Sequence, residues 1–164
     1  QLGFMVYYGI GAAAAVRVSQ LVGQRDVRRA AACAYAAMHM VLLLAVAVCV
    51  PLFLVRHDIG LLFTSDAEVC GMVAVTMIPF MLYQAGDGMQ IIFSNGLRGL
   101  SNVRPLVPVA FTSYFVVSLP LSYFFGIVEG MGLVGIWMAF PFGLTASGVL
   151  YLLFFRRTVR RMSA

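Results

Sequence analysis

Five long apolar runs, separated by short polar connections, make up most of the chain. The runs occupy residues 2–21, 30–55, 69–97, 105–128 and 130–155. Each is long enough to cross a bilayer as a helix, which takes about 20 apolar residues, and none shows the strict alternation that is typical of membrane-barrel strands. Because a helix pairs its own backbone groups in hydrocarbon, the pattern predicts an all-α, polytopic membrane bundle of about five transmembrane helices.

The composition excludes a water-soluble globule. Hydrophobic residues make up 62% of the 164 residues and charged residues only 10%, whereas soluble domains contain roughly 45–50% apolar and 25% charged residues. The three cysteines, Cys33, Cys49 and Cys70, all lie in apolar runs and show no CxxC spacing. We therefore expect neither a disulfide framework nor a cysteine metal site, and no cofactor.

The basic residues predict how the chain is oriented. All eleven are arginines, against six acids. Most of them lie at alternate ends of the runs: Arg25, Arg28, Arg29, Arg98, Arg104, Arg156, Arg157, Arg160 and Arg161. By the positive-inside rule these ends, including the tail 156–164, face the cytoplasm.

The same arginines also indicate the partners. Arg17 and Arg98 lie near predicted cytoplasmic helix ends, where a long basic side chain can reach the interface, so we interpret both as anchors. The bilayer is the expected partner. Nucleic acid is not expected, because the arginines form no continuous basic face along one element.

One acid, Asp87, lies deep within the third run. A carboxylate at the centre of a spanning helix is unfavourable by at least about 2.5–3.5 kcal/mol, so such a residue is a functional candidate. Thr76, Tyr83, Gln90 and Ser94 fall with Asp87 within a sector of roughly 60°, at about 100° per residue. The sequence therefore predicts a polar stripe along an otherwise apolar helix.

Two interpretations of Asp87 stay open from the residues alone. In the first, Asp87 takes up a cation, sodium or a proton, with the Tyr83 hydroxyl one turn away as a second oxygen ligand. In the second, it pairs with a polar group on a neighbouring helix. Gly86 and Gly88 flank the carboxylate, and we expect them to leave room around it and to allow the helix to loosen locally.

The polar connections contain no motif of an enzyme. They hold no Ser/His/Asp or Cys/His constellation, no HExxH and no phosphate-binding GxGxxG. Because these patterns carry the common hydrolytic, metal and nucleotide chemistries, we do not expect an enzyme.

Five ordered strings resemble the multidrug and toxic compound extrusion (MATE) family of transporters. They are Val16-Arg17-Val18-Ser19 followed by Gly23 and Asp26; Leu62-Phe63-Thr64-Ser65-Asp66; Tyr83-Gln84 with Asp87, Gln90 and Leu97-Arg98-Gly99; Pro120-Leu121-Ser122-Tyr123; and Gly132 with Gly135-Ile136-Trp137. The resemblance covers essentially the whole chain and matches helices eight to twelve of a twelve-helix, two-lobe transporter. Residues 1–164 are then a single, partial C-lobe.

The resemblance implies an antiporter that exports drugs or other xenobiotic organic compounds while sodium ions or protons enter. Asp87 and Tyr83 match the C-lobe cation-binding pair of the family, and we expect Gln90, Ser94, Thr76 and Gln84 to line the cavity. The N-terminal lobe and helix seven, with a glutamate that completes the site in sodium-coupled relatives, are absent from this chain. Ala139 stands where a glycine is common.

The expected location is the bacterial inner (plasma) membrane, with the C-terminus in the cytoplasm, and the expected partners are the missing N-terminal lobe and small organic substrates. Two other functions remain open. One is a lipid-linked saccharide flippase of the same superfamily, which is expected to have a more cationic cavity. The other is a membrane scaffold subunit that transports nothing, in which Asp87 is an interhelical hydrogen-bonding group.

Overall fold

Each predicted run corresponds to one long helix in the computed structural model, which describes residues 2–56, 58–59 and 66–163. The helices are α1 (Leu2–Gly23), α2 (Val27–Leu54), α3 (Ala67–Gly99), a fourth helix (Leu106–Val128) and α6 (Gly132–Ser163). All five are long and apolar enough to cross a membrane, and the described residues contain no strand. The all-α prediction is confirmed, although residues 62–65 of the second family string lie outside the described residues.

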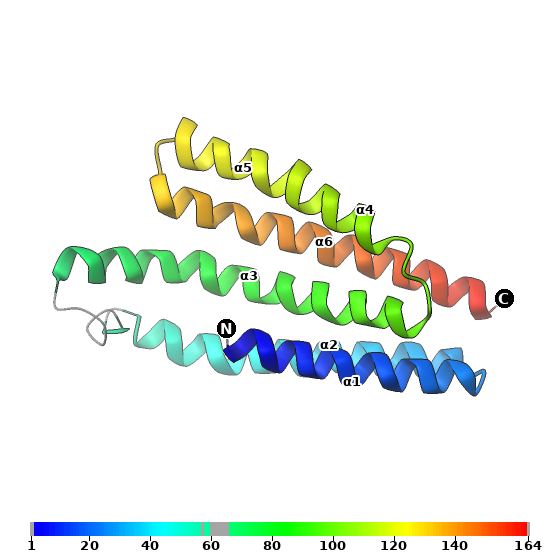
Figure 1. Cartoon of the computed structure of the whole chain (residues 1–164). Coiled ribbons are helices and arrows are strands. Elements are labelled where there is room, and N and C mark those ends of the chain that lie inside the picture. Colours follow the sequence, from blue (N-terminus) through cyan, green and yellow to red (C-terminus); the bar gives the residue numbers. More distant parts are fainter. Residues whose placement is uncertain (1, 57, 60–65, 164) are drawn as a thin grey trace.

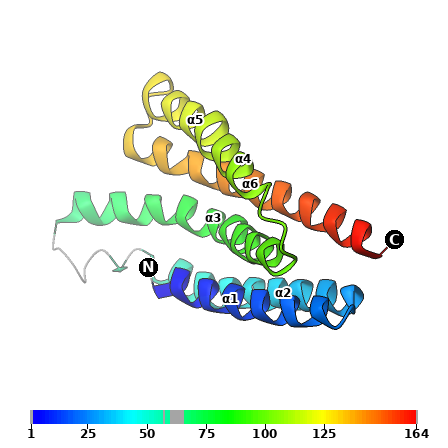
Figure 2. The same cartoon turned by 45° about the vertical axis from the view of Figure 1, so that its right-hand side comes forward.

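Helix α3 is the centre of the bundle. In Figures 1 and 2 it lies between the pair α1 and α2 on one side and the pair formed by α6 and the fourth helix on the other. It runs in the same direction as α1 and α6, while α2 and the fourth helix run in the opposite direction. Helix α3 therefore packs against helices of both pairs.

Two helix ends differ from the predicted limits by more than two residues, each for a local reason. Helix α2 begins at Val27 rather than at residue 30, because the Asp26 side chain caps it and accepts a hydrogen bond from the Arg29 N–H at 3.0 Å. Helix α6 continues past residue 155 to Ser163, with Arg160 and Arg161 in its last turn. Basic side chains there stabilise the negative end of the helix dipole.

The fourth helix is irregular in a way that the sequence pattern does not reveal. It consists of α4 (Leu106–Phe111), a π-helical stretch (Thr112–Ser118), α5 (Leu119–Tyr123) and a second π-helical stretch (Phe124–Val128). Ser113 and Ser118, five residues apart, are both buried. In an α-helix they would lie about 140° apart at 100° per residue, but a π turn brings them onto one face.

The surface of the bundle is strongly apolar. Leu43, Leu54 and Val107 are 72%, 75% and 76% exposed, and many other large apolar side chains are exposed on all helices. Soluble proteins rarely present such continuous apolar surface, whereas lipid tails are as apolar as leucine. Together with the five spanning helices, this surface identifies an integral membrane protein.

Candidate functional site

The polar stripe of α3 lies between the two faces by which α3 packs against its neighbours. On one flank, Ile91 packs against Gly11 of α1; on the other, Gly86 packs against the backbone of Thr145 in α6. In projection down the axis of α3, at about 100° per residue, Asp87 lies between Gly86 and Ile91. Among the described residues, α1 and the fourth helix form no packed interface with each other, so the stripe faces the side of the lobe between them.

The glycines beside Asp87 serve helix packing. A Cβ on Gly86 would lie 2.8 Å from the Thr145 backbone nitrogen, and a Cβ on Gly88 would lie 2.5 Å from Val41 Cγ1 of α2. Helix α3 is regular α-helix through both positions. The expected local loosening is therefore not observed, and the glycines instead allow α6 and α2 to approach α3 at the level of the carboxylate.

Asp87 is half-buried, and the described residues show neither a hydrogen bond nor a salt bridge for it. A partly buried charge without a partner is costly. The interhelical pairing that was the second interpretation of Asp87 has no partner in the described part of this lobe.

Two tyrosines lie close to Asp87. Tyr83, one turn earlier on α3, is half-buried, packs edge-on against Phe80 with ring centroids 5.2 Å apart, and interacts electrostatically with Asp87. Tyr7 of α1 interacts electrostatically with both Tyr83 and Asp87. The structure thus brings the predicted pair together and adds a third oxygen from another helix.

Tyr7 is the residue of this cluster that the sequence did not single out. It is 1% exposed, and its hydroxyl has no hydrogen-bond partner in the described part of the chain. Its place follows from the register of α1 on α3: Gly11, one turn later, packs against Ile91, one turn after Asp87. Helical side chains lean toward the N-terminus of their helix, so the Tyr7 ring reaches back to the level of Asp87 and Tyr83.

Cys49 of α2 lies at the edge of the same cluster. It is a free, half-buried thiol that interacts electrostatically with Tyr7 and Tyr83. The described residues contain no group of three or more His, Cys, Asp and Glu side chains that could hold a metal ion. The groups that interact electrostatically in this cluster are the Asp87 carboxylate, the Tyr7 and Tyr83 phenols and the Cys49 thiol.

Gln90 has a different role from Asp87, although it lies on the same stripe. Its amide nitrogen donates to the Tyr114 hydroxyl at 2.8 Å, and its amide oxygen accepts from Ser147 Oγ at 2.8 Å. These bonds join α3 to the fourth helix and to α6. Gln90 also lines a cavity of about 530 Å³ with Ser94 and Arg98.

The remaining predicted site residues lie apart from this cavity. Thr76 donates to the Met72 carbonyl at 2.8 Å and lines a separate apolar groove of about 290 Å³ with Phe80 and Trp137. Gln84 is buried, at 6% exposure, in the helix packing. Neither Thr76 nor Gln84 lines the cavity of Gln90, and the two residues do not share a cavity.

The two predicted anchors are exposed at the helix ends. Arg17 donates to Gln20 Oε1 at 3.3 Å, and Arg98 donates to Asn95 Oδ1 at 3.3 Å. Both guanidinium groups bond within their own helix. Arg98 also reaches the cavity of Gln90 and gives it one positive charge.

Comparisons with known proteins agree with this geometry. A family model described as MatE matches residues 1–124 of the chain. The chain belongs to the MatE family. This match confirms the family that the five sequence strings resemble.

Relatives of the MatE chain include multidrug resistance proteins. MdtK of Yersinia pseudotuberculosis is 36% identical over 156 residues, and MdtK of Proteus mirabilis is 35% identical over 153 residues. The matches cover 93% and 91% of this chain but only 34% of each relative. The chain therefore spans about one third (34%) of the length of these relatives.

Solved structures of MatE-type transporters share the fold. An inward-facing multidrug resistance MATE family transporter matches with a TM-score of 0.88 at 18% identity, over 99% of this chain and 38% of its own. The eukaryotic MATE transporter AtDTX14 matches with a TM-score of 0.85 at 22% identity, over 98% and 37%. A MOP superfamily transporter from Pyrococcus furiosus matches with 0.89 at 16%, over 99% and 37%.

Proposed function

We propose that this chain is most of the C-terminal lobe, helices eight to twelve, of a cation-coupled antiporter that exports drugs or other xenobiotic organic compounds across a bacterial inner membrane. The observation that carries the proposal is the half-buried Asp87 carboxylate, which has no ion-pair partner among the described residues and interacts electrostatically with Tyr83 and Tyr7. The names of the MdtK relatives support multidrug export. Sodium ions and protons are both candidates for the coupling cation.

Asp87 is suited to binding a cation that comes and goes. Hard cations prefer oxygen ligands, and within the described part of the chain the cluster offers a carboxylate with two phenolic oxygens and no arginine that interacts with Asp87. An apolar setting destabilises a bare carboxylate anion, so a bound cation or proton stabilises it more there than in water. The bound state is therefore stabilised without a permanent ion pair that would hold the site closed.

Cation binding at Asp87 is the step that links the gradient to export. One charge entering through a potential of 100 mV releases about 2.3 kcal/mol, which corresponds to roughly a fiftyfold concentration ratio. That is enough to drive useful export of a neutral substrate. The cation shifts the lobes between facing states because it binds one state more tightly than the other.

The test is efflux of a cationic aromatic dye, such as ethidium, from cells that express the complete reading frame containing this chain. We expect Asp87→Asn to lower the efflux rate at least about tenfold, since it removes the carboxylate charge that the described residues bring to the site. Glu129→Gln, which makes the same chemical change in the exposed connection before α6, is the matched control. It should transport normally at equal membrane abundance.

The outcomes test the site and the function separately. Normal efflux by Asp87→Asn, with both variants inserted at equal levels, would show that Asp87 is not the coupling residue, whereas a wild-type protein that gives no efflux would favour the scaffold. Repeating the wild-type measurement after sodium removal, and separately with a protonophore, distinguishes the coupling ions. The gradient whose loss abolishes efflux is the one that drives it.

A further inference from the structure

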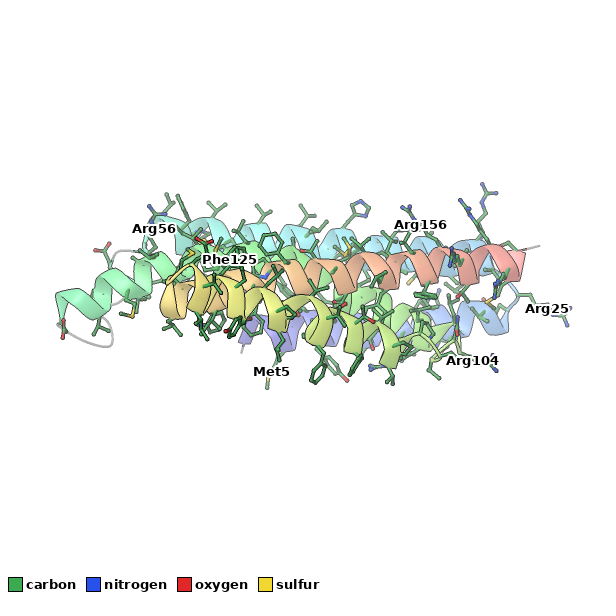
Figure 3. All side chains as sticks on the ribbon, turned by 90° about the horizontal axis from the view of Figure 1, so that it is seen from above. Met5, Arg25, Arg56, Arg104, Phe125 and Arg156 are labelled. Carbon is green, nitrogen blue, oxygen red and sulfur yellow. The ribbon has the colours of Figure 1, made fainter. Side chains whose placement is uncertain are left out.

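The C-terminal end of α6 forms a basic pocket that the transport proposal does not use. Arg104, Arg157 and Arg161 line a cavity of about 410 Å³ between the connection 100–105 and the last turns of α6. The rest of its lining includes four largely apolar side chains: Pro105, Pro108, Phe154 and Met162. Figure 3 shows Arg104 at the same end of the bundle as Arg25 and Arg156, and Arg56 toward the opposite end.

The polypeptide holds the three arginines together. Asn102 Nδ2 donates to Thr158 Oγ1 at 2.8 Å, which fastens the connection to α6 two residues before Arg104. Thr158 Oγ1 itself donates to the Phe154 carbonyl at 2.8 Å. Arg157 and Arg161 lie one helical turn apart and therefore on the same side of α6. The pocket is thus fixed by helix geometry and by one hydrogen bond between elements.

The positive charge of this pocket is not neutralised within the described residues. No acid is among its lining residues. Asp26, the one acid in the sequence near the arginine-rich ends, pairs with Arg29 at 3.2 Å. The C-terminus of α6 contributes only about half a negative charge, which leaves a clear excess of positive charge facing the cavity.

We propose that this pocket binds the headgroup of an anionic phospholipid. Guanidinium groups match phosphate oxygens in a bidentate geometry, and arginine is preferred where such recognition matters. The apolar wall formed by Pro108 and Phe154 suits the glycerol and upper acyl region of the same molecule. Basic pockets between spanning helices at the membrane surface are where such headgroups bind.

A lipid fits this pocket better than free phosphate does. The pocket lies at the ends of two spanning helices, α6 and the fourth helix, where headgroups are present at high local concentration. Free phosphate would use the arginines but not the apolar wall. The lipid would also hold the connection 100–105 against α6, since it contacts both.

The experiment uses the purified full-length protein in neutral detergent, titrated with phosphatidylglycerol and followed by native mass spectrometry. The variant is Arg104→Gln with Arg161→Gln, which removes one charge from each element. Near an anionic surface each arginine contributes about fivefold in affinity, so the double variant should bind about 25-fold more weakly. Phosphatidylcholine should bind both proteins weakly and equally.

The matched control is Arg25→Gln with Arg28→Gln. Both residues are exposed at the same end of the bundle, outside the pocket lining, and this double variant should bind phosphatidylglycerol within about twofold of wild type because only general surface charge changes. Equal weakening in the two double variants would overturn the proposal.

Two further arms guard against misfolding and identify the source of the phosphate. Arg104→Lys with Arg161→Lys keeps the charge and should bind at a strength between wild type and the glutamine variant, because a lysine cannot bind phosphate in a bidentate way. Inorganic phosphate at millimolar concentration should not displace the lipid. Displacement would mean that the pocket takes free phosphate and would overturn the lipid assignment.

Discussion

Tyr7 adds a buried hydroxyl from α1 to a site whose other oxygens come from α3. At 1% exposure it has no hydrogen-bond partner among the described side chains, which is costly unless some ligand satisfies it. Asp87 is the carboxylate with which it interacts electrostatically. A cation at Asp87 would supply the missing partner for the phenolic oxygen.

Replacing Tyr7 should therefore weaken cation binding without preventing folding. We expect Tyr7→Phe to raise the cation concentration that gives half-maximal efflux about tenfold, the loss of roughly one hydrogen bond to a charged group. The maximal rate should change less. Tyr123→Phe, at a tyrosine that is 59% exposed on the fourth helix, is the control. An unchanged half-maximal concentration would remove Tyr7 from the site.

The candidate site was predictable only in part. Asp87 and Tyr83 are accessible to sequence reasoning because an acid inside an apolar run is conspicuous and the helical period relates its neighbours to it. Tyr7, Tyr114 and Ser147 are ordinary residues of apolar runs, and only the packing of four helices brings them to α3. Pairing between helices leaves no local signal in a single sequence.

At the scale of elements, the glycines of α3 show that close approach matters more than flexibility. Gly86 packs against the Thr145 backbone. A Cβ placed on Gly148 of α6 would lie only 3.2 Å from the Gly86 carbonyl oxygen. Small residues at such crossings allow van der Waals packing, which drives helix association in lipid. The crossing of α3 and α6 therefore sets the depth at which Asp87 is held.

A methyl group at this crossing should destabilise the bundle. We expect Gly86→Ala to lower the stability of the detergent-solubilised protein by about 1–3 kcal/mol, the usual effect of overpacking. Thermal unfolding of the purified protein measures this. Gly71→Ala is the matched control on the same helix, because a Cβ there meets nothing within 4 Å, and it should be neutral or slightly stabilising. Equal stability of the two variants would contradict a tight crossing.

The number of long helices was predictable from the sequence, but the start of α2 and the π-helical stretches were not. Run length alone identifies five helices, because each spanning helix must be long and apolar. The start of α2 depends on the Asp26 cap, and the π-helical stretches depend on how the fourth helix packs against α6. Neither is visible in a hydrophobic pattern.

At the scale of the whole molecule, the arginines divide the two membrane faces. The connection that contains Gln24 and the connection 100–105 lie at one end of the bundle, together with the C-terminal end of α6 (Figure 1). The C-terminal end of α2, which precedes Asp58 in the sequence, lies at the other end. The positive-inside rule then predicts a cytoplasmic C-terminus.

Single cysteines test this orientation in intact cells. With Cys33, Cys49 and Cys70 replaced by serine, we expect Asp58→Cys to react with a membrane-impermeant maleimide from outside. Gln24→Cys should react only after the membrane is permeabilised. Both positions are exposed, so the difference would report sidedness rather than burial. The reverse pattern would mean that the lobe is inverted.

The π-helical stretch Thr112–Ser118 gives the fourth helix an unusual tolerance to changes in length. Deleting one residue there can convert a π turn into an α turn while Leu119 and everything after it keep the same face toward α6. The same deletion within α3 or α6 would rotate all later residues by about 100°. Compared with α3 and α6, the fourth helix should therefore keep its packing best after the deletion of one residue.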